Sequence, residues 1–499
     1  MSKTFNFIKK RALNYPNRLA IRQDKEVINY ADLINKTIEL SEHIQSKNIK
    51  RIALLEDNSI NWILLDLACQ ISGTTLVPLP KFFTNEHLKK IIQLTNIEYL
   101  VTRNTSYIES LIEEDVQLDQ TFNILKWFKI NHVSKNSKIK DKSPENTQKI
   151  TFTSGSTNEP KGVCLNEEAQ YIVAKSVFSV TKNIESKKHL CVMPFTTLLE
   201  NIAGIYVPLM RGNLIIIEKP SSLGFKDVFL NDLDLFLERI SSLEPSSMIV
   251  PPEILRLMVS AAKGGWRPPL SLTFLTVGGS KVSGSLIREA RSYNINAFEG
   301  YGLSESASVV SLNLPDDNKI GLQGKLLPHV QIKISNGELY IKNIGFLGYL
   351  DDYLKKQETA EEWINSGDLA TFDKTKNLKI IGRKKNLIIS SYGRNISPEW
   401  VETELSNSEY IKNAVLIGNH KPFCVALIIP EKSHINTSLK LKDEIDRVNQ
   451  HLPGFAQIKK WKILDNDFPR NLFRNHFIPN RKEISRFYSK EINALYCIG

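Results

Sequence analysis

The chain has 499 residues, more than a single hydrophobic core usually holds, and 41% of them are hydrophobic, so we expect a globular protein of two or more domains. Its formal net charge of +11, from 65 Lys and Arg against 54 Asp and Glu, is spread along the chain without a long basic run. This charge fits a polyanionic small molecule, an acidic protein partner or a generic solvated surface, and the lack of any DNA- or RNA-binding motif argues against nucleic acid.

Neither the cysteines nor the hydropathy of the chain indicates export or membrane insertion. Five scattered cysteines show no CxxC spacing, so we predict no disulfide framework and no zinc site. Residues 1–18 lack the apolar core of a signal peptide, and no segment reaches the roughly 18 apolar residues that span a bilayer. We therefore predict a cytoplasmic protein without a transmembrane segment; its oligomeric state does not follow from these patterns.

Short apolar runs alternate with helix-like stretches over much of the chain. The pattern begins between residues 52 and 79, where RIALLED and TTLVPLP flank the helical NWILLDLACQISG. Strands that alternate with helices predict an α/β sheet whose faces are covered. Further apolar runs of this kind lie at residues 98–102, 189–195, 213–219, 247–252 and 272–279.

The loop TFTSGSTNEPKG, residues 151–162, carries five hydroxyl side chains in seven residues and then a lysine, which favours an anion. It fails the P-loop pattern GxxxxGK[ST], because Pro160 replaces the second Gly and Gly162 follows Lys161. The alternative is a plain polar turn into a helix, with Asn166 as N-cap and acidic residues in the first turn. The loop alone leaves both interpretations open.

The character of the chain changes after Gly321 to shorter, hairpin-like strands. The stretch VQIKISNGELYIKN, residues 330–343, carries Asn-Gly between two alternating runs and predicts a β-hairpin. We place a boundary near Gly382, which divides the chain into a large domain, residues 1–382, and a small domain, residues 383–499.

Four further stretches mix glycine with charge where a packed core needs neither. Singly, each can be a tight turn, an N-cap turn or a solvated basic turn. They are LTVGGSKVSG (275–284), FEGYGLSESAS (298–308), WINSGDLATFD (363–373) and IIGRKKNLIISSYGRN (380–395).

Taken in order, these stretches and the loop resemble the signatures of the acyl-adenylate-forming (AMP-binding) superfamily, which includes acyl-CoA synthetases, the adenylation domains of peptide synthetases and firefly luciferase. Those signatures read roughly [ST]SG[ST]TGxPKG, YGxTE, TGD, and GRxxD followed by a GxN turn; here they read TSGSTNEPKG, YGLSE, SGD, and GRKKN followed by GRN. The resemblance covers nearly the whole chain and is strongest to long-chain acyl-CoA synthetases, the fatty acid–CoA ligases.

The resemblance implies an α/β fold. A large N-terminal domain of αβ-layered sheets would carry a small β-barrel-like subdomain, and a small mobile α+β C-terminal domain would follow. The activity it implies is that of an AMP-forming acid–thiol ligase, which uses ATP and Mg²⁺ to convert a carboxylic acid into an acyl-adenylate, with coenzyme A as the acceptor.

Both reactants of adenylation are anions, so charge neutralisation is the main task of such a site. In the loop, hydroxyl groups donate to phosphate oxygens, a glycine allows close backbone approach, and Lys161 adds positive charge. The resemblance implies Glu305 and Thr157 as magnesium ligands, since this hard cation needs oxygen ligands. The loop residues assigned to the nucleotide are Thr153, Ser154, Gly155, Ser156, Thr157 and Lys161.

The resemblance also assigns the nucleoside. Tyr301 would stack on adenine, Asp368 would accept from both ribose hydroxyls, and Arg383 would contact the ribose from the domain junction. Residues that line the nucleotide around them are Gly278, Gly279, Ser280, Gly300, Gly302 and Ser304.

Two lysines have roles that depend on the small domain. The resemblance implies a catalytic, ATP-contacting lysine near the end of the chain, and FIPNRKEISR places Lys482 there, although Arg481 stands where Gly or an apolar residue is usual. The alternative is a solvated helix start, with Lys460, Lys462 and Lys490 as the next candidates. The hinge falls at Lys385, where a polar, exposed residue can absorb a large backbone change.

The chain departs from the family pattern at Asn158, Ser304, Asn386 and Tyr392, and the last of these leaves the acceptor less defined. Thr196 occupies the position of the aspartate that binds an α-amino group in peptide-synthetase domains, so an amino acid has no counter-ion. We predict a medium- or long-chain fatty acid, and the residues assigned to the acid are Thr197, Asn201, Gly204 and Gly278.

Three alternatives to a fatty acid–CoA ligase stay open. An aryl-CoA ligase differs in its acid, and an acyl-[carrier protein] ligase differs in its acceptor, which would be a separate acyl carrier protein. The third is a nucleotide- or acyl-binding protein without activity, against which the intact set of charged residues argues.

Overall fold

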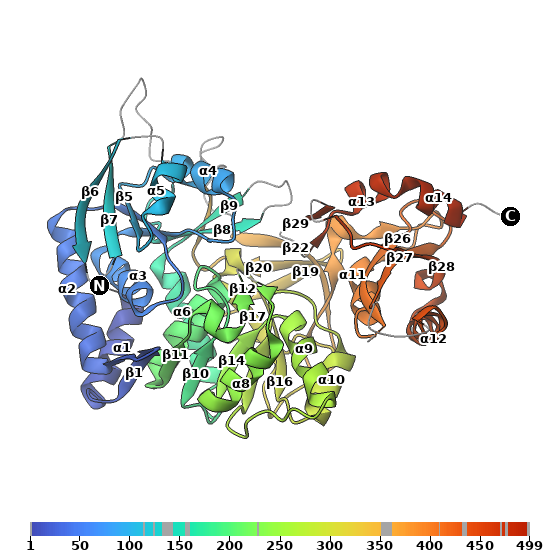
Figure 1. Ribbon diagram of the computed structural model, residues 1–499, viewed down its shortest axis with the longest axis horizontal. Helices are drawn as coiled ribbons and strands as arrows, with labels where there is room; N and C mark the ends of the chain where they lie inside the picture. Colours follow the sequence, from blue (N-terminus) through green and yellow to red (C-terminus); the bar gives the residue numbers. More distant parts are fainter. Residues whose placement is uncertain are drawn as a thin grey trace.

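The computed structural model describes residues 2–112, 115–122, 125–131, 143–154, 160–226, 229–350, 362–408, 410–431, 437–469, 472–474 and 478–496. The chain forms an α/β protein with a large N-terminal part and a smaller C-terminal part, which lies at one end of the long axis (Figure 1). Two large sheets build the N-terminal part.

The first sheet has nine strands in the order β18-β17-β16-β15-β14-β10-β11-β1-β2. Its central strands run parallel, and β2, β17 and β18 join antiparallel at the edges. The strands are β1 (Leu19–Gln23), β2 (Glu26–Asn29), β10 (Lys188–Cys191), β11 (Leu214–Ile217), β14 (Ser247–Val250), β15 (Phe274–Val277), β16 (Ala297–Leu303), β17 (Ser308–Leu312) and β18 (Lys325–Leu326).

The second sheet has eight strands in the order β21-β9-β8-β4-β3-β5-β7-β6. Strands β8 and β9 form an antiparallel pair around the loop singled out in the sequence. The strands are β3 (Arg51–Leu55), β4 (Thr75–Pro78), β5 (Tyr99–Thr102), β6 (Asp115–Phe122), β7 (Leu125–Asn131), β8 (Lys149–Ser154), β9 (Pro160–Leu165) and β21 (Phe346–Tyr349).

Helices cover both faces of both sheets, which gives a helix–sheet–helix–sheet–helix stack. The central layer packs one core against Ile215 of the first sheet and Leu54 of the second, whereas the neighbouring Ile216 and Leu55 point to the outer cores. The central helices are α1 (Lys3–Asn14), α2 (Tyr30–Ser46), α3 (Ile60–Ser72), α6 (Glu167–Val180), the π-helix η1 (Glu200–Tyr206) and α7 (Val207–Arg211). The outer ones are α4 (Asn85–Thr95) and α5 (Ser106–Leu111) on one side, and α8 (Leu233–Leu243), α9 (Pro252–Lys263) and α10 (Gly284–Ser292) on the other.

The predicted hairpin forms, and it belongs to a separate four-stranded antiparallel sheet of order β19-β20-β22-β23. Asn336 and Gly337 both have positive φ, 50° and 79°, as the tight turn between its strands requires. The strands are β19 (Ile332–Ser335), β20 (Glu338–Lys342), β22 (Trp363–Phe372) and β23 (Leu378–Arg383).

The C-terminal part is built on a three-stranded sheet with helices on both faces. Its main elements are α11 (Pro398–Leu405), β26 (Ile411–Ile417), β27 (Cys424–Pro430), α12 (Thr437–Gln450), β28 (Ile458–Ile463), α13 (Arg481–Phe487) and α14 (Ser489–Tyr496). Minor elements of the whole chain are η2 (Pro220–Leu223), β12 (Phe225–Lys226), β13 (Phe229–Leu230), η3 (Ser304–Ser306), η4 (Lys384–Asn386), β24 (Ile388–Ile389), β25 (Asn395–Ile396), η5 (Gly454–Ala456), β29 (Phe473–Arg474) and β30 (Ile478–Pro479).

A fully buried ion pair joins three of the central elements. Lys149 Nζ at the start of β8 lies 2.7 Å from Asp66 Oδ1 on α3, and both side chains are 1% exposed. Lys149 also donates to Asn201 Oδ1 at 2.5 Å, and Tyr206 donates to Asp66 Oδ2 at 2.5 Å, both from η1. Burial lowers the pKa of Lys149, and Asp66 opposes that shift. The pair therefore fixes α3, β8 and η1 to one another.

Within the parts of the chain that the structure describes, no helix combines the length and apolar character needed to cross a membrane. The cytoplasmic location stays a prediction.

The Asp66→Asn variant should lose about 3–5 kcal/mol of the free energy of unfolding, because it leaves the Lys149 cation buried without its counter-ion. Urea denaturation followed by circular dichroism measures this loss. The Asp57→Ala variant is the matched control: Asp57 forms an exposed pair with Lys81 at 2.6 Å, which should contribute less than about 1 kcal/mol. Equal destabilisation in the two variants would contradict the role given to the buried pair.

Candidate active site

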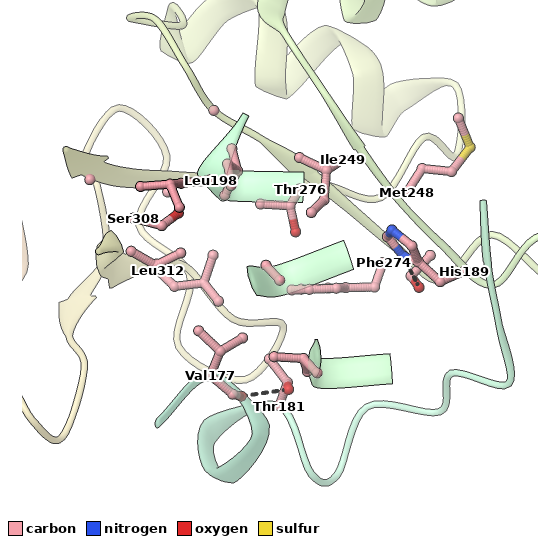
Figure 2. A pocket seen from close by; sticks show the side chains of 18 of the residues that line it. Val177, Thr181, His189, Leu198, Met248, Ile249, Phe274, Thr276, Ser308 and Leu312 are labelled. Atoms are coloured by element: carbon pink, nitrogen blue, oxygen red, sulfur yellow. Dashed lines mark hydrogen bonds between the residues drawn. The ribbon is translucent and has the colours of Figure 1, made fainter. Parts of the chain in front are cut away.

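A cavity of about 240 Å³ lies between the first sheet and the central helices α6, η1 and α7. Its walls are mainly apolar, with Val177, Leu198, Met248, Phe274 and Leu312 among the lining side chains (Figure 2). At one end it is lined by glycines and by residues 300–304, which belong to two of the stretches singled out in the sequence. The cavity therefore begins at the predicted nucleotide site and continues along the sheet.

Strand β16 ends at this mouth with a close backbone approach. A Cβ atom on Gly302 would lie 1.6 Å from the Ser308 carbonyl oxygen of the neighbouring β17, so no larger residue fits without moving the backbone. Gly279, which follows β15, has φ of 90°. Gly278, Gly279, Gly300, Tyr301, Gly302 and Ser304 all line the cavity, as the sequence analysis placed them around the nucleotide.

Asp368 and Arg383 meet Tyr301 at the same mouth. The Tyr301 hydroxyl donates to Asp368 Oδ2 at 2.5 Å, and Arg383 Nε lies 2.7 Å from Asp368 Oδ1. Asp368 is 3% exposed, and its burial raises its pKa even though Arg383 opposes the shift. Three residues from strands β16, β22 and β23 thus form one connected group.

Lys161 and Glu305 form a second group through a tyrosine that the sequence analysis did not single out. Tyr349 donates to Glu305 Oε1 at 2.6 Å, and Lys161 Nζ lies 4.0 Å from the centre of its ring. Tyr349 belongs to β21, which pairs with β9, so the edge of the second sheet brings it to Lys161. Little in the sequence indicated a role for Tyr349, because this residue lies outside every motif recognised above.

Part of the phosphate loop lies outside the described residues. These are Gly155, Ser156 and Thr157 of the predicted set. Thr153 and Ser154 lie in β8, where Thr153 pairs with Lys161 of β9 and Ser154 pairs with Pro160. Ser280 is exposed just past Gly279.

The four residues assigned to the acid fall into two groups. Thr197 and Gly278 line the cavity. Asn201 and Gly204 do not, and we revise their role: Asn201 is 1% exposed in the Lys149 network, where its amide donates to Asp66 Oδ2 at 3.0 Å. Gly204 packs on the far side of η1, where a Cβ would lie 2.3 Å from Glu200 Oε1. Both support the cavity wall from behind.

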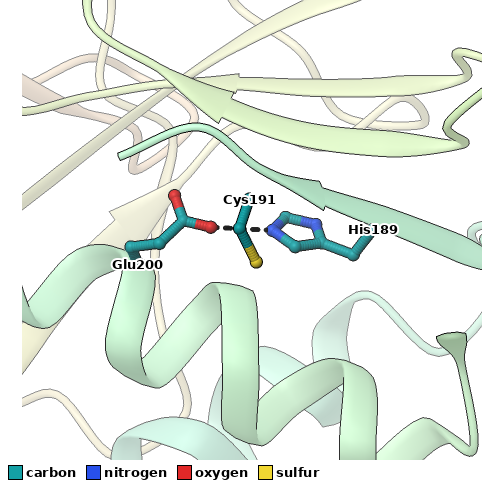
Figure 3. A group of neighbouring side chains, drawn as sticks. All are labelled: His189, Cys191 and Glu200. Carbon is teal, nitrogen blue, oxygen red and sulfur yellow. Dashed lines mark hydrogen bonds and ion pairs between the residues drawn. The ribbon is translucent and has the colours of Figure 1, made fainter. Parts of the chain in front are cut away.

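Sequence reasoning also missed a buried group at this wall, formed by His189, Cys191 and Glu200 (Figure 3). His189 Nε2 lies 3.0 Å from Glu200 Oε1, and its Nδ1 lies 3.0 Å from the Ser247 hydroxyl. The three side chains lie close enough to share a ligand, His189 and Glu200 already bond to each other, and burial raises the pKa of the Cys191 thiol well above its usual range. In the sequence, this group was indicated only by Glu200, the single acidic residue of the stretch TTLLENIAG.

The two lysines of the small domain stand apart from the cavity lining. Lys482 is exposed in the first turn of α13, and Lys385 is exposed in η4 directly after Arg383. The unusual Arg481 has a local explanation: its guanidinium forms an ion pair with the buried Glu402 of α11 and lies 4.0 Å from Glu399. Arg481 therefore joins α13 to α11 within the small domain, whereas the role of Lys482 stays a prediction.

Two family models and several relatives match most of the chain. The family model described as "AMP-binding enzyme" matches residues 8–348, and the one described as "AMP-binding enzyme C-terminal domain" matches residues 385–497. A 2-succinylbenzoate–CoA ligase of Staphylococcus epidermidis is 26% identical over 423 residues, 83% of this chain and 84% of that protein. A long-chain-fatty-acid–CoA ligase of Mycobacterium bovis is 30% identical over 251 residues, 44% of this chain and 41% of that protein.

Solved structures share the fold over the whole chain. The o-succinylbenzoate CoA synthetase of Bacillus subtilis in complex with its acyl-adenylate has a TM-score of 0.73 at 19% identity, with 96% of this chain and 97% of that chain covered. An anthranilate CoA ligase in complex with anthranoyl-AMP has a TM-score of 0.80 at 14% identity, with 99% and 98% covered. The predicted α/β fold, with a large N-terminal and a smaller C-terminal domain, is confirmed, and the chain belongs to the AMP-binding enzyme family.

Proposed function

We propose that this protein activates a carboxylic acid with ATP, releases pyrophosphate, and transfers the acyl group from the acyl-adenylate to the thiol of coenzyme A. The observation that carries the proposal is the pair of charged groups at the motif residues, Asp368 with Arg383 and Glu305 near Lys161, beside a mainly apolar cavity. The large domain, residues 1–382, would hold ATP and the acid, and the small domain, residues 383–499, would move between the two steps.

Each charged group suits its part of the nucleotide. Asp368 accepts one bond at each carboxylate oxygen, and a carboxylate has about four acceptor sites, so capacity remains for two ribose hydroxyls. Glu305 uses Oε1 for the Tyr349 hydroxyl, which leaves Oε2 as the hard oxygen ligand that Mg²⁺ takes. When bound, Mg²⁺ neutralises phosphate charge.

The attack of the carboxylate on the α-phosphorus brings two anions together, so this chain's cations decide the rate. Lys161 holds positive charge at the β8–β9 loop, and Lys482 would add a second cation from the small domain during adenylation. Tyr349 orients both Lys161 and Glu305, because its ring faces the ammonium while its hydroxyl donates to the carboxylate.

The acid that fits best is a medium- to long-chain fatty acid without an α-amino group. None of the residues that line the cavity, all of which are described, is Asp or Glu, so an ammonium group would be buried without a counter-ion. A volume of about 240 Å³ is at the small end for a ligand cavity, which favours a medium chain over a long one held entirely inside.

An aryl acid is a second candidate. Phe274 lines the cavity and stacks on Phe298 at 5.1 Å between ring centres, which provides a rigid flat surface for a ring. The relative named for 2-succinylbenzoate supports an aryl acid, and the relative named for long-chain fatty acids supports a fatty acid. For the acceptor, a separate acyl carrier protein is the alternative to coenzyme A.

Carboxylic acids without an amino group should support ATP-dependent pyrophosphate release, and α-amino acids should not. The reason is that no Asp or Glu lines the cavity to pair with an α-ammonium group. A coupled pyrophosphate assay over fatty, aryl and amino acids, each with and without coenzyme A, checks this. Turnover with amino acids alone would refute the proposed substrate class.

The Glu305→Gln variant should adenylate about 10²-fold more slowly, because it removes one charge from the metal site. The magnesium dependence of pyrophosphate release is the measurement, and Glu289→Gln, a change in a surface pair with Lys263, is the matched control. Unchanged adenylation by Glu305→Gln would remove this residue from the metal site.

The Lys482→Ala variant should lose adenylation by about 10²-fold or more, comparable to the loss of an oxyanion donor, and should keep thioester formation from supplied acyl-adenylate. Lys385→Pro should do the opposite, because a fixed φ hinders movement at the hinge. Lys442→Ala, which removes an exposed lysine from α12, is the matched control. If Lys482→Ala slows both steps equally, or neither, the catalytic lysine lies elsewhere in the small domain.

A further inference from the structure

Strand β23 carries Arg383 to the mouth of the cavity, and its pairing with β22 is irregular just before that residue. The register shifts between Leu369 and Ala370 of β22, which leaves Ile381 of β23 as an extra, unmatched residue. Such a bulge bends its strand and changes the direction of the side chains beside it. The direction in which Arg383 approaches Asp368 therefore depends on how this bulge is held.

Two side chains from outside this sheet bond to the peptide groups at the bulge. Gln323 Oε1, from the loop between β17 and β18, accepts from the Ile380 N–H at 2.6 Å. Lys281 Nζ, from the stretch that follows β15, donates to the Ile381 carbonyl at 3.2 Å. A bulge disrupts the ladder of a strand locally, so side chains can take the place of missing backbone partners. The bulge is thus held from the first sheet.

Gln323 is also bonded to the strand that carries Tyr301. Its Nε2 donates to Glu299 Oε1 at 2.7 Å, and Glu299 lies two residues before Tyr301 on β16. Both side chains are buried. The Ile380 N–H can only donate, so the amide oxygen of Gln323 must face it and the amide nitrogen must face Glu299. One buried side chain therefore bridges the strand of Tyr301 and the strand of Arg383.

The loop around Gln323 does not depend on this side chain for its own place. Gln323 N donates to the Leu378 carbonyl at 2.8 Å, and Leu378 N donates to the Gly324 carbonyl at 2.9 Å. The Ser311 hydroxyl donates to the Gln323 carbonyl at 2.7 Å. Because a change of the Gln323 side chain keeps these bonds, we expect such a variant to fold. It loses the contact at the bulge, two residues nearer to Arg383.

The charges around the bridge come from both domains. Burial raises the pKa of Glu299 to about 7, and the hydrogen bond from Gln323 and the Lys281 ammonium group oppose that shift. Burial lowers the pKa of Lys281, and Glu299 opposes this together with Glu399 and Glu404 of the small domain, whereas Lys379 adds to it. Well above pH 7, Glu299 is therefore an anion that attracts Lys281.

We propose that Gln323, paired with Glu299, is a positioning residue for nucleotide binding: it fixes the bulge in β23 so that Arg383 stays against Asp368, where the ribose is proposed to bind. Arg383 Nε lies 2.7 Å from Asp368 Oδ1, and its side chain is 45% exposed, so its place depends on where β23 puts its backbone. The inference rests on the proposed function, since it concerns the nucleotide of that reaction.

The test exchanges the two partners of the bridge. At about pH 8, where Glu299 is ionised, Gln323→Glu puts a second carboxylate against it and opens the bridge. The Kd for AMP and the KM for ATP should rise about 5- to 10-fold, the effect of one lost hydrogen bond, with kcat nearly unchanged. The rise in melting temperature with AMP, recorded without acid, reports nucleotide affinity, and pyrophosphate release gives KM and kcat.

The double variant Glu299→Gln, Gln323→Glu should restore both constants. In it the amide donates from position 299, and the introduced carboxylate accepts from that amide and from the Ile380 N–H. A residue that only fills space would not be rescued by this exchange. Gln331→Glu is the matched control, because it makes the same change of charge at an exposed glutamine just before β19.

Equal AMP affinity in Gln323→Glu and Gln331→Glu would overturn the inference, and so would a double variant no better than Gln323→Glu. If no acid releases pyrophosphate but AMP binding follows the expected order, the proposed function fails and the positioning role stands. If the wild type does not bind AMP, both fail. Should Gln323→Glu not fold, Gln323→Leu decides: weaker AMP binding supports the inference, and unchanged binding overturns it.

Discussion

The buried pair of Asp66 and Lys149 is the constraint on which the active site depends. Lys149 begins the strand that leads into the phosphate loop, and its partners Asn201 and Tyr206 belong to the helix that walls the acid cavity. Burying two charges is costly and is offset only when the geometry of all partners is right. The strand that leads into the proposed phosphate loop and the wall of the cavity proposed for the acid are thus placed by a single set of hydrogen bonds.

Tyrosine side chains organise the mouth of the site in a similar way. Tyr301 donates to Asp368, and Tyr349 donates to Glu305, so each acidic residue assigned to the nucleotide is oriented by a phenol. A phenol orients a carboxylate through one donor without adding charge. The two carboxylates are therefore held in position for the ribose and metal contacts proposed for them.

Local patterns in the sequence were sufficient for the alternation of strands and helices, for the Asn336-Gly337 hairpin and for the helix that Asn166 caps, because each depends on neighbouring residues. The pairing of Asp66 with Lys149 could not be predicted: each reads as one polar residue beside an apolar run, and only the packing of two distant elements brings them together. The assignment of Asn201 and Gly204 to the acid had a similar cause. The direction in which these residues face depends on the geometry of the helix, which the spacing of the motif does not reveal.

That helix geometry has a consequence for how variation in the cavity wall can be interpreted. A π-helix has a wider turn than an α-helix, and η1 continues directly into α7, which has the normal pitch. A step of four residues is slightly more than one turn of an α-helix and slightly less than one turn of a π-helix. Side chains four apart therefore rotate one way about the axis along η1 and the opposite way along α7. Leu199, Ala203, Val207 and Arg211 stay aligned as a result. Deleting one residue from η1 would leave Ala203, Val207 and Arg211 three, seven and eleven residues after Leu199, the spacing of one face of an ordinary α-helix, so the same side chains would still face the cavity.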